Sequence, residues 1–242
     1  MIDNFLIIIP ARGGSKRIPD KNIKKIFGYP MIYWPLKELS KGFNSKNILI
    51  STDDTKIVKT VEKIGINIPF LRPKYLSDDF TGTMPVVEHA LGWYEKNVKK
   101  IDYVIVVYPT ALMLKFKNIK EAIKILEMDN TCELVMSATN FPSPIQRGLY
   151  LDKNGYAKMF SPKNYTSRSQ DLINSFHDAG QFYVWRSSSV RNKKTLVNSK
   201  VKLFHINREF VVDIDTEEDI KIVKKKLKYF KLDKFKSNWK FK

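Results

Sequence analysis

The fold is decided by residues 5–22, which read FLIIIPARGGSKRIPDKN. The apolar run Phe5–Pro10 predicts a buried strand, and the loop Ala11–Asn22 that follows it is rich in glycine and in basic residues. Gly13 and Gly14 let the backbone turn sharply and present its N–H groups without obstruction by side chains. Four cations surround those amides: Arg12, Lys16, Arg17 and Lys21. The loop is therefore predicted to bind a highly charged anion such as a triphosphate.

This loop differs from the two familiar phosphate-binding loops. A Walker A loop requires G-x-x-x-x-G-K-[ST], a dinucleotide fingerprint requires G-x-G-x-x-G at the start of a helix, and neither pattern is present. Pro19 indicates that the loop does not continue straight into a helix. Because open α/β sheets bind ligands at the carboxyl ends of their strands, we expect the loop to bind a ligand and not to be solvated surface alone.

Outward from this stretch, short β-branched runs alternate with segments of helical period, which is the pattern of βαβ units. The expected strands are Phe5–Pro10, Lys46–Ser51, Tyr103–Val107, Glu133–Ala138, Val201–Ile206 and Phe210–Ile214. The expected helices are Asp54–Gly65, Thr83–Val98, Asn118–Met128 and one that begins at Glu217, where Thr216 and Asp219 form a capping box. We predict an α/β fold with three α/β/α layers, Rossmann-like, around a mostly parallel sheet.

One section, residues 139–186, breaks this rhythm. It contains three prolines, two turns with glycine and many polar side chains. We interpret it as a small insertion in a single domain that spans residues 1–230, with residues 231–242 as a lysine-rich C-terminal tail.

The composition excludes several classes of protein. The chain has 242 residues, of which 43% are hydrophobic and 28% charged, so it suits one globular domain and not a disordered chain. No window approaches 18 uninterrupted apolar residues, which argues against a membrane-spanning helix, and Phe5–Ile9 lacks the flanks of a secretion signal. The single cysteine, Cys132, allows no internal disulfide. We expect a cytoplasmic protein with no membrane partner.

The formal net charge of +18 is concentrated at the end of the chain. Residues 224–242 hold nine lysines and one aspartate, so this segment supplies +8 and the preceding 223 residues supply +10. A tail of lysines and aromatic residues is compatible with nucleic-acid binding. We favour the alternative, a solvated helix end whose lysines lie over the negative pole of the helix dipole, and expect no nucleic-acid partner.

Asp213 and Asp215 form a second chemical signal. Alternate positions of a strand share a face, so both carboxylates can point into one cleft. Such a pair suits Mg²⁺, which takes one or two carboxylates from a protein and keeps several waters. The competing explanation is that Asp215 and Thr216 only end a strand and cap the helix that follows.

Taken in order, the motifs resemble those of the CMP-sugar synthetases that act on sialic acids. The resemblance covers residues 5 to about 230 and rests on the first loop and on STDD (51–54), FLRP (70–73), LSDDFTGT (76–83), YPT (108–110) and VDIDTEED (212–219). Within that cytidylyltransferase family, FPSPIQR (141–147), TRSQD (167–171) and HDAGQFY (177–183) are similar to the branch that acts on pseudaminic acid. The broader pattern has glutamine where this chain has Tyr108, a departure that weakens an assignment to neuraminate.

The resemblance implies a nucleotide-diphospho-sugar transferase-like fold and a specific reaction. The anomeric hydroxyl of the sugar acid attacks the α-phosphorus of CTP, pyrophosphate leaves, and a CMP-sugar forms for surface glycosylation, commonly of flagellin. It also implies Mg²⁺ as cofactor and a homodimer in which the insertion of one subunit reaches the active site of the other. Catalysis of such a displacement depends on positioning and on neutralisation of charge.

Residue roles also follow from the resemblance. Lys21, Asp213 and Asp215 are implied to be catalytic, with the two aspartates as metal ligands. The implied nucleotide-binding residues are Ala11, Arg12, Gly13, Ser15, Lys16, Asn22, Arg72 and Thr83, with Ser77 and Asp78 as weaker candidates. In the insertion, cationic and amide side chains suit a sugar carboxylate and acylamino groups: Gln146, Arg147, Arg168, Gln170, His177, Asp178 and Gln181.

Three alternatives stay open at this point. The same chemistry could act on another acid, such as neuraminate, legionaminate or the eight-carbon acid of lipopolysaccharide. A nucleic-acid-binding module driven by the basic tail is a second alternative, which truncation after Phe230 would separate from a synthetase. A nicotinamide-dependent dehydrogenase is disfavoured because the dinucleotide fingerprint is missing.

Overall fold

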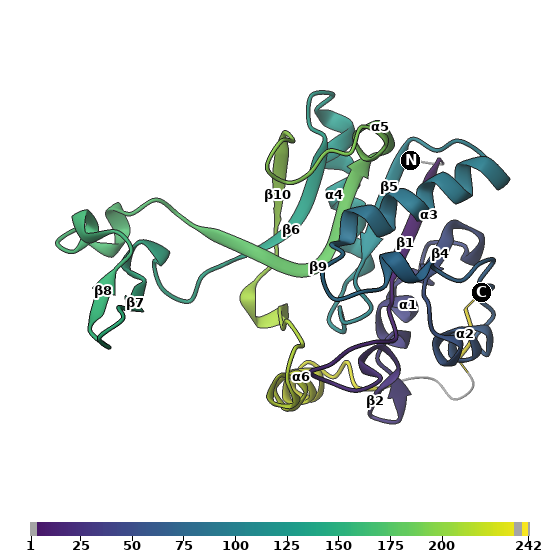
Figure 1. Ribbon diagram of the computed structural model, residues 1–242, viewed down its shortest axis with the longest axis horizontal. Helices are drawn as coiled ribbons and strands as arrows, with labels where there is room; N and C mark the ends of the chain where they lie inside the picture. Colours follow the sequence, from purple (N-terminus) through teal and green to yellow (C-terminus); the bar gives the residue numbers. More distant parts are fainter. Residues whose placement is uncertain (1–3, 235–238, 242) are drawn as a thin grey trace.

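The structure, a computed structural model, describes residues 4–234 and 239–241 and is organised around one sheet (Figure 1). Its six strands lie in the order β10-β6-β9-β5-β1-β4. Their bounds are β1 Phe5–Pro10, β4 Ile48–Ser51, β5 Tyr103–Val107, β6 Leu134–Asn140, β9 Phe176–Arg186 and β10 Val201–His205. Strand β1 pairs in parallel with β4 and β5, and β10 pairs in parallel with β6, whereas β9 runs antiparallel to both of its neighbours.

The alternation of side chains along β1 explains the layers. Ile7 and Ile9 belong to one buried cluster, and Leu6 and Ile8 belong to another, because successive side chains of a strand point to opposite faces. The first cluster packs under α1 (Tyr33–Leu39), α2 (Thr55–Glu62) and α4 (Phe116–Met128). The second packs under α3 (Thr83–Asn97) and α5 (Ser187–Arg191). The predicted three-layer α/β/α fold with a mostly parallel sheet is confirmed.

A third apolar cluster supports the edge of the body that carries Asp213 and Asp215. Helix α6 (Glu217–Tyr229) buries Ile220, Val223 and Leu227 against Trp34 and Leu112. Thr216 and Asp219 form the predicted capping box at its start, where each satisfies a backbone N–H of the other. The same cluster includes residues next to the short hairpin of β2 (Lys25–Ile26) and β3 (Tyr29–Pro30).

Two expected boundaries are wrong. Residues 210–214 form no strand in the described part of the chain; Arg208–Phe210 is one turn of 3₁₀-helix and the rest is irregular. The apolar pattern there arises because Phe210 and Val212 pack against the α6 cluster and Ile214 is part of it. The insertion also ends earlier than residue 186, because Phe176–Arg186 is a long central strand of the sheet.

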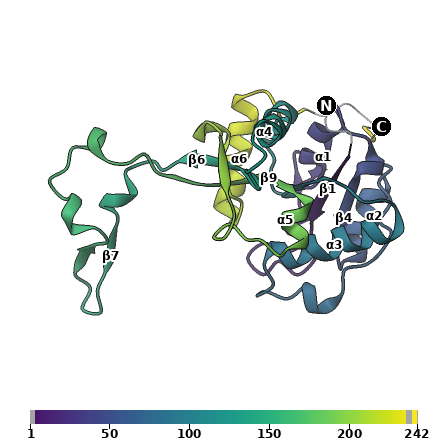
Figure 2. The ribbon, with the colours of Figure 1, turned by 90° about the horizontal axis from the view of Figure 1, so that it is seen from above.

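What leaves the sheet is residues 141–175, which we call the arm. The arm extends from the ends of β6 and β9 and projects away from the body, as both views show (Figures 1 and 2). It contains a small hairpin of β7 (Leu149–Leu151) and β8 (Ala157–Met159). None of residues 141–175, all of which the structure describes, is buried.

The C-terminal tail differs from the expected solvated helix end. Part of it, residues 235–238 and 242, lies outside the described residues. Within the described part, the Phe241 side chain is 7% exposed and its N–H donates to the carbonyl oxygen of Ile64 at 2.9 Å. The Trp239 ring lies 6.0 Å from that of Tyr33 on α1. The tail therefore packs Trp239 and Phe241 onto the body. Among the described residues, no helix has the length and apolar character needed to cross a bilayer.

Candidate active site

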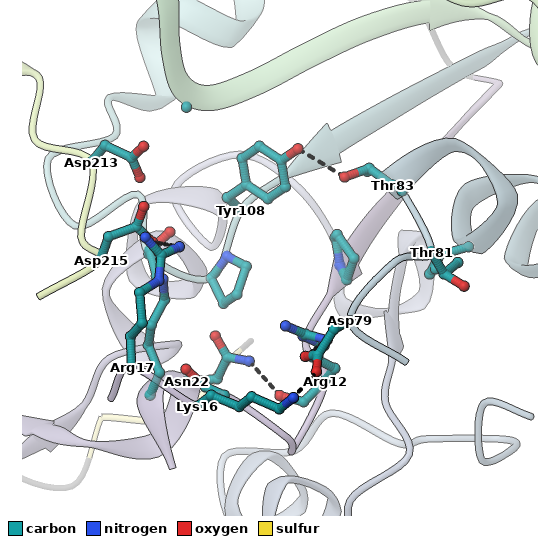
Figure 3. A pocket seen from close by; sticks show the side chains of 18 of the residues that line it. Arg12, Lys16, Arg17, Asn22, Asp79, Thr81, Thr83, Tyr108, Asp213 and Asp215 are labelled. Atoms are coloured by element: carbon teal, nitrogen blue, oxygen red, sulfur yellow. Dashed lines mark hydrogen bonds and ion pairs between the residues drawn. The ribbon is translucent and has the colours of Figure 1, made fainter. Parts of the chain in front are cut away.

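A cavity of about 790 Å³ opens at the carboxyl ends of β1 and β5. The loop after β1, the loop before α3, the turn after β5, the start of β9 and the segment before α6 all contribute to its wall. Figure 3 shows side chains from the loop after β1, the loop before α3, the turn after β5 and the segment before α6 around one space. Of the residues predicted to form the site, these line the cavity: Arg12, Ser15, Lys16, Lys21, Asn22, Arg72, Thr83, Asp178, Asp213 and Asp215.

The loop after β1 is held in a fixed shape by hydrogen bonds from outside it. The Gly13 N–H donates to Asp53 Oδ1 at 3.0 Å, and a Cβ on Gly13 would lie 2.5 Å from Asp54 Oδ2, so only glycine fits there. Asn22 Nδ2 donates to the Arg12 carbonyl oxygen at 2.8 Å and closes the loop (Figure 3). The STDD motif at 51–54 thus shapes the loop, and Ala11 is buried at its base.

The four cations of the loop divide into two pairs, each facing one carboxylate. Arg12 and Lys16 lie 2.9 Å and 2.5 Å from the oxygens of Asp79. Arg17 and Lys21 lie 2.8 Å and 3.0 Å from Asp215 Oδ1, and Lys21 Nζ also donates to the Ile214 carbonyl oxygen. Arg17 and Lys21 thus join the positive loop to the acidic segment before α6 across the cavity.

Asp213 and Asp215 both face the cavity although they do not lie on a strand. The irregular extended segment before α6 presents them together, as Figure 3 shows. Burial raises the pKa of Asp213, and the negative charge of Asp215 raises it further. A second positive charge beside these carboxylates would relieve that repulsion.

A divalent cation fits this pair. Among the described residues, no cluster of three or more His, Cys, Asp or Glu side chains is placed to hold a metal. Two carboxylates at the edge of an anion-binding cavity match the way Mg²⁺ binds, because Mg²⁺ takes few protein ligands and completes its shell with waters and phosphates. The donor set present is therefore compatible with the predicted Mg²⁺.

Arg72 is the most buried charged side chain of the site, at 5% exposure. Its Nη2 donates to the Ser51 carbonyl oxygen at 2.6 Å and its Nη1 to that of Leu76 at 3.3 Å. Within the described chain its Nε has no hydrogen-bond partner. Burial lowers the pKa of Arg72, and Asp53 opposes that shift.

Two tyrosines form the wall of the cavity opposite the cation loop. Thr83 Oγ1 lies 2.9 Å from the Tyr108 hydroxyl (Figure 3), and the rings of Tyr108 and Tyr183 pack edge to face at 5.6 Å. Tyr183 donates its hydroxyl hydrogen bond to Asp178. Burial raises the pKa of Tyr183, reinforced by Tyr108 and Asp178, so this hydroxyl stays protonated and acts as a donor.

Most of the predicted sugar-binding residues lie elsewhere. Gln146, Arg147, Arg168 and Gln170 are on the arm, away from the cavity of their own chain. Gln146 and Arg147 donate to carbonyl oxygens within the arm, and Arg168 forms two hydrogen bonds with Asp171, at 2.7 Å and 3.1 Å. His177 Nδ1 lies 2.8 Å from the Asp178 carbonyl oxygen. Gln181 is buried, and its Nε2 donates to the Phe210 carbonyl oxygen at 2.7 Å.

Sequence reasoning missed the parts of the site that depend on distant pairing. Tyr183 lies within a quoted motif, but its contact with Tyr108 requires β5 and β9 to be neighbours. Asp79 was not among the predicted site residues: Asp78 Oδ1 accepts the N–H groups of Phe80 and Thr81, and Asp79 enters the cavity. No local pattern distinguishes such an aspartate from a helix cap.

Known proteins resemble this chain along most of its length. At 37% identity over 219 residues, covering 90% of this chain and 94% of its own, a pseudaminic acid cytidylyltransferase of Campylobacter jejuni is similar to it. An N-acylneuraminate cytidylyltransferase of Streptococcus agalactiae is 27% identical, over 88% of this chain and 51% of its own length. The solved CMP:2-keto-3-deoxy-manno-octonic acid synthetase, complexed with CTP, has a TM-score of 0.69 at 16% identity, over 94% of this chain and all of that one, and so shares the fold.

A family model described as cytidylyltransferase matches residues 6–230, which spans β1, the cation loop, the arm and α6. The resemblance predicted from the motifs is confirmed. The chain is an enzyme of the nucleotidyltransferase class and belongs to the cytidylyltransferase family.

Proposed function

We propose that this enzyme transfers CMP from CTP to the anomeric hydroxyl of pseudaminic acid and releases pyrophosphate. The observation that carries the proposal is the cavity in which a fixed loop with four cations faces two carboxylates. The 37% identity to a pseudaminic acid cytidylyltransferase supports the choice of sugar, and the C. coli relative described as a flagellin modification protein supports a role in surface glycosylation. The reaction belongs in the cytoplasm, where CTP is made.

The chain's own groups account for nucleotide binding. Arg12, Ser15, Lys16 and Lys21 would hold the triphosphate. Arg72 lines the cavity and would contribute positive charge beside the nucleotide, and Thr83 lies at the N-terminus of α3 on the same wall. As the anomeric oxygen bonds to the α-phosphorus, the bond from that phosphorus to the bridging oxygen of the β-phosphate breaks. Lys21 and Arg17 lie where they would neutralise the departing charge.

Asp213 and Asp215 would hold Mg²⁺, which when bound supplies positive charge at the reacting phosphate. Asp215 then has to exchange its contacts with Arg17 and Lys21 for the cation, leaving those two side chains available to the phosphates. Asp213 lines the same cavity as Asp178, and the negative charge of Asp178 acts on it.

The sugar acid would be recognised by two copies of the chain. Gln146, Arg147, Arg168 and Gln170 lie on an arm that carries many exposed apolar side chains, and the structure gives them no access to their own cavity. We therefore propose a homodimer in which each arm covers the cavity of its partner and supplies an arginine to the sugar carboxylate. Asp178, Tyr108 and Tyr183 would contact the sugar from the body.

The test is turnover with purified enzyme, CTP and Mg²⁺, followed by release of pyrophosphate. Pseudaminic, N-acetylneuraminic and legionaminic acids are compared at equal concentration. We expect pseudaminic acid to give the highest kcat/KM. Preference for another acid would move the substrate assignment to that acid, and absence of release with all three would refute the cytidylyltransferase reaction on nonulosonic acids.

A further inference from the structure

The proposed reaction leaves Asp79, a carboxylate that faces the cation loop, without a role. It lines the cavity and pairs with both Arg12 and Lys16, at 2.9 Å and 2.5 Å (Figure 3). Those two cations are proposed to hold the triphosphate. Arginine receives a carboxylate and a phosphate through the same fork of N–H groups, so one ligand has to leave before the other binds.

The segment that carries Asp79 is attached at its base and free at its tip. Asp78 Oδ1 accepts the N–H groups of Phe80 and Thr81, and the Asp78 carbonyl oxygen accepts a hydrogen bond from Arg12 at 2.6 Å. Phe80 lines the cavity yet is 95% exposed, so no packing holds it in place. The ion pairs of Asp79 and the bond from Arg12 are thus the main contacts of this tip with the cation loop.

Resting on the proposed function, we infer that Asp79 is an internal competitor of the nucleotide's terminal phosphates. It neutralises Arg12 and Lys16 in the free enzyme, gives them up to the β- and γ-phosphates of CTP, and pairs with them again as pyrophosphate leaves. Asp79 is therefore a residue that sets the affinity for pyrophosphate and favours its release. Lys16 and Arg12 together lower the pKa of the Asp79 carboxyl, so it is ionised and competes over the whole working range of pH.

The competition has a selective signature. Ligands that reach Arg12 and Lys16, namely pyrophosphate and CTP, have to displace Asp79, whereas CMP lacks both terminal phosphates and leaves the pairs intact. Removing the Asp79 carboxylate should therefore strengthen the binding of pyrophosphate and CTP and leave the binding of CMP unchanged. Two exposed ion pairs of this kind correspond to a gain of about two- to tenfold in affinity.

The experiment measures dissociation constants for inorganic pyrophosphate, CTP and CMP by calorimetry, without sugar and without metal. Asp79→Asn is compared with Asp79→Ala, because alanine cannot donate a new hydrogen bond to phosphate. The matched control is Asp20→Asn, which removes one negative charge from the cation loop itself, at a position that faces Lys56 at 3.3 Å and does not line the cavity. Thermal melting of each variant confirms that it is folded.

We expect both Asp79 variants to bind pyrophosphate and CTP about two- to tenfold more tightly, to bind CMP within twofold of wild type, and to be inhibited by pyrophosphate at correspondingly lower concentration. Unchanged or weaker pyrophosphate binding in both variants would overturn the inference, as would an equal gain in Asp20→Asn. Wild type that binds pyrophosphate but no cytidine nucleotide would instead refute the proposed function, while the pyrophosphate comparison would still decide the role of Asp79.

Discussion

The body and the arm of this molecule differ in how they are stabilised: the body has a buried apolar core, and the arm has none. In the body, β1 lies between two apolar layers, and the cavity at its end is fixed by hydrogen bonds and ion pairs between segments far apart in sequence. In the arm, no residue of 141–175 is buried and large apolar side chains such as Leu151, Tyr165 and Ile173 are exposed. A segment of this size with no core of its own requires a surface to cover. The comparison suggests that one chain carries a complete nucleotide site but only the detached half of a sugar site.

Deleting the arm tests this division most severely. Asn140 and Phe176 are register partners across β6 and β9, so residues 141–175 can be replaced by an Asn-Gly turn. We expect the dissociation constant for CTP to stay within about twofold, and turnover of pseudaminic acid to fall by about a thousandfold or more, because orientation of the sugar is lost. Calorimetry and pyrophosphate release measure the two quantities. Retained turnover would show that the arm is dispensable for sugar binding.

Neutralising Asp213 and Asp215 together changes the cavity on the body and leaves the arm intact. We expect the double variant Asp213→Asn, Asp215→Asn to lose about 10²–10³-fold in kcat, since the charge that stabilises the reacting phosphate is no longer held. Titration of Mg²⁺ in the presence of CTP should show weakened uptake of the cation. Full activity in this variant would remove the pair from the reaction.

A single arginine of the arm gives an intermediate effect. Arg168→Ala should raise KM for the sugar by about tenfold or more, because a charge-assisted hydrogen bond to the carboxylate is lost, and should leave KM for CTP unchanged. Steady-state kinetics with each substrate varied in turn separate the two. Arg191→Ala is the matched control, because Arg191 forms an ion pair with Glu95 outside the cavity.

Two phenylalanines contrast the packing of body and arm. Phe241 is 7% exposed within the first apolar cluster, whereas Phe160 on the arm is 69% exposed. We expect Phe241→Ala to lower the free energy of unfolding by about 2–4 kcal/mol, and Phe160→Ala by less than about 0.5 kcal/mol at concentrations where the chain is monomeric. Urea denaturation measures both. Equal losses would mean that the tail does not dock on the body as described.

The smallest effect concerns the edge strand β10 of the sheet, at the end away from the arm. Lys202 on β10 lies 2.7 Å from Asp129 and, with Thr131, holds the pKa of that carboxyl well below its ordinary value. A lowered pKa in the folded state stabilises the fold fully above the unfolded pKa of about 4, and this contribution is lost only as the pH falls through the lower pKa of the folded state. We expect Asp129→Asn to melt slightly lower than wild type at pH 7, and we expect the difference in melting temperature to shrink as the pH is lowered below about 4. A difference that does not change below that pH would assign the effect to another cause.

Much of the body was accessible from the sequence because its signals are local. The run Phe5–Pro10, the capping box at Thr216 and the glycine-rich cation loop each need only neighbouring residues to be recognised. Asp213 and Asp215 were predicted to share a face for the wrong reason: an irregular segment, not a strand, presents them together.

The missed features depend on partners far along the chain. Phe176–Arg186 was assigned to the insertion because glycine and polar residues interrupt its apolar pattern, and only its pairing with β5 and β6 reveals a central strand. The docking of Phe241 beside Ile64 was hidden for a similar reason: the lysines around it indicate a solvated segment. Truncation after Phe230 would therefore also remove a packed side chain, so replacing tail lysines by glutamine is the cleaner test of nucleic-acid binding.

The proposal that each arm completes the partner's cavity is tested most directly by mixing two inactive variants. One carries Asp213→Asn and Asp215→Asn with its arm intact, and the other carries Arg147→Ala and Arg168→Ala with its cavity intact. If arms act on the partner, every mixed dimer contains one complete site, and equal mixing with exchange should restore about a quarter of wild-type turnover. Turnover that stays at the sum of the two separate variants would contradict the account, because it would mean that each arm serves its own chain.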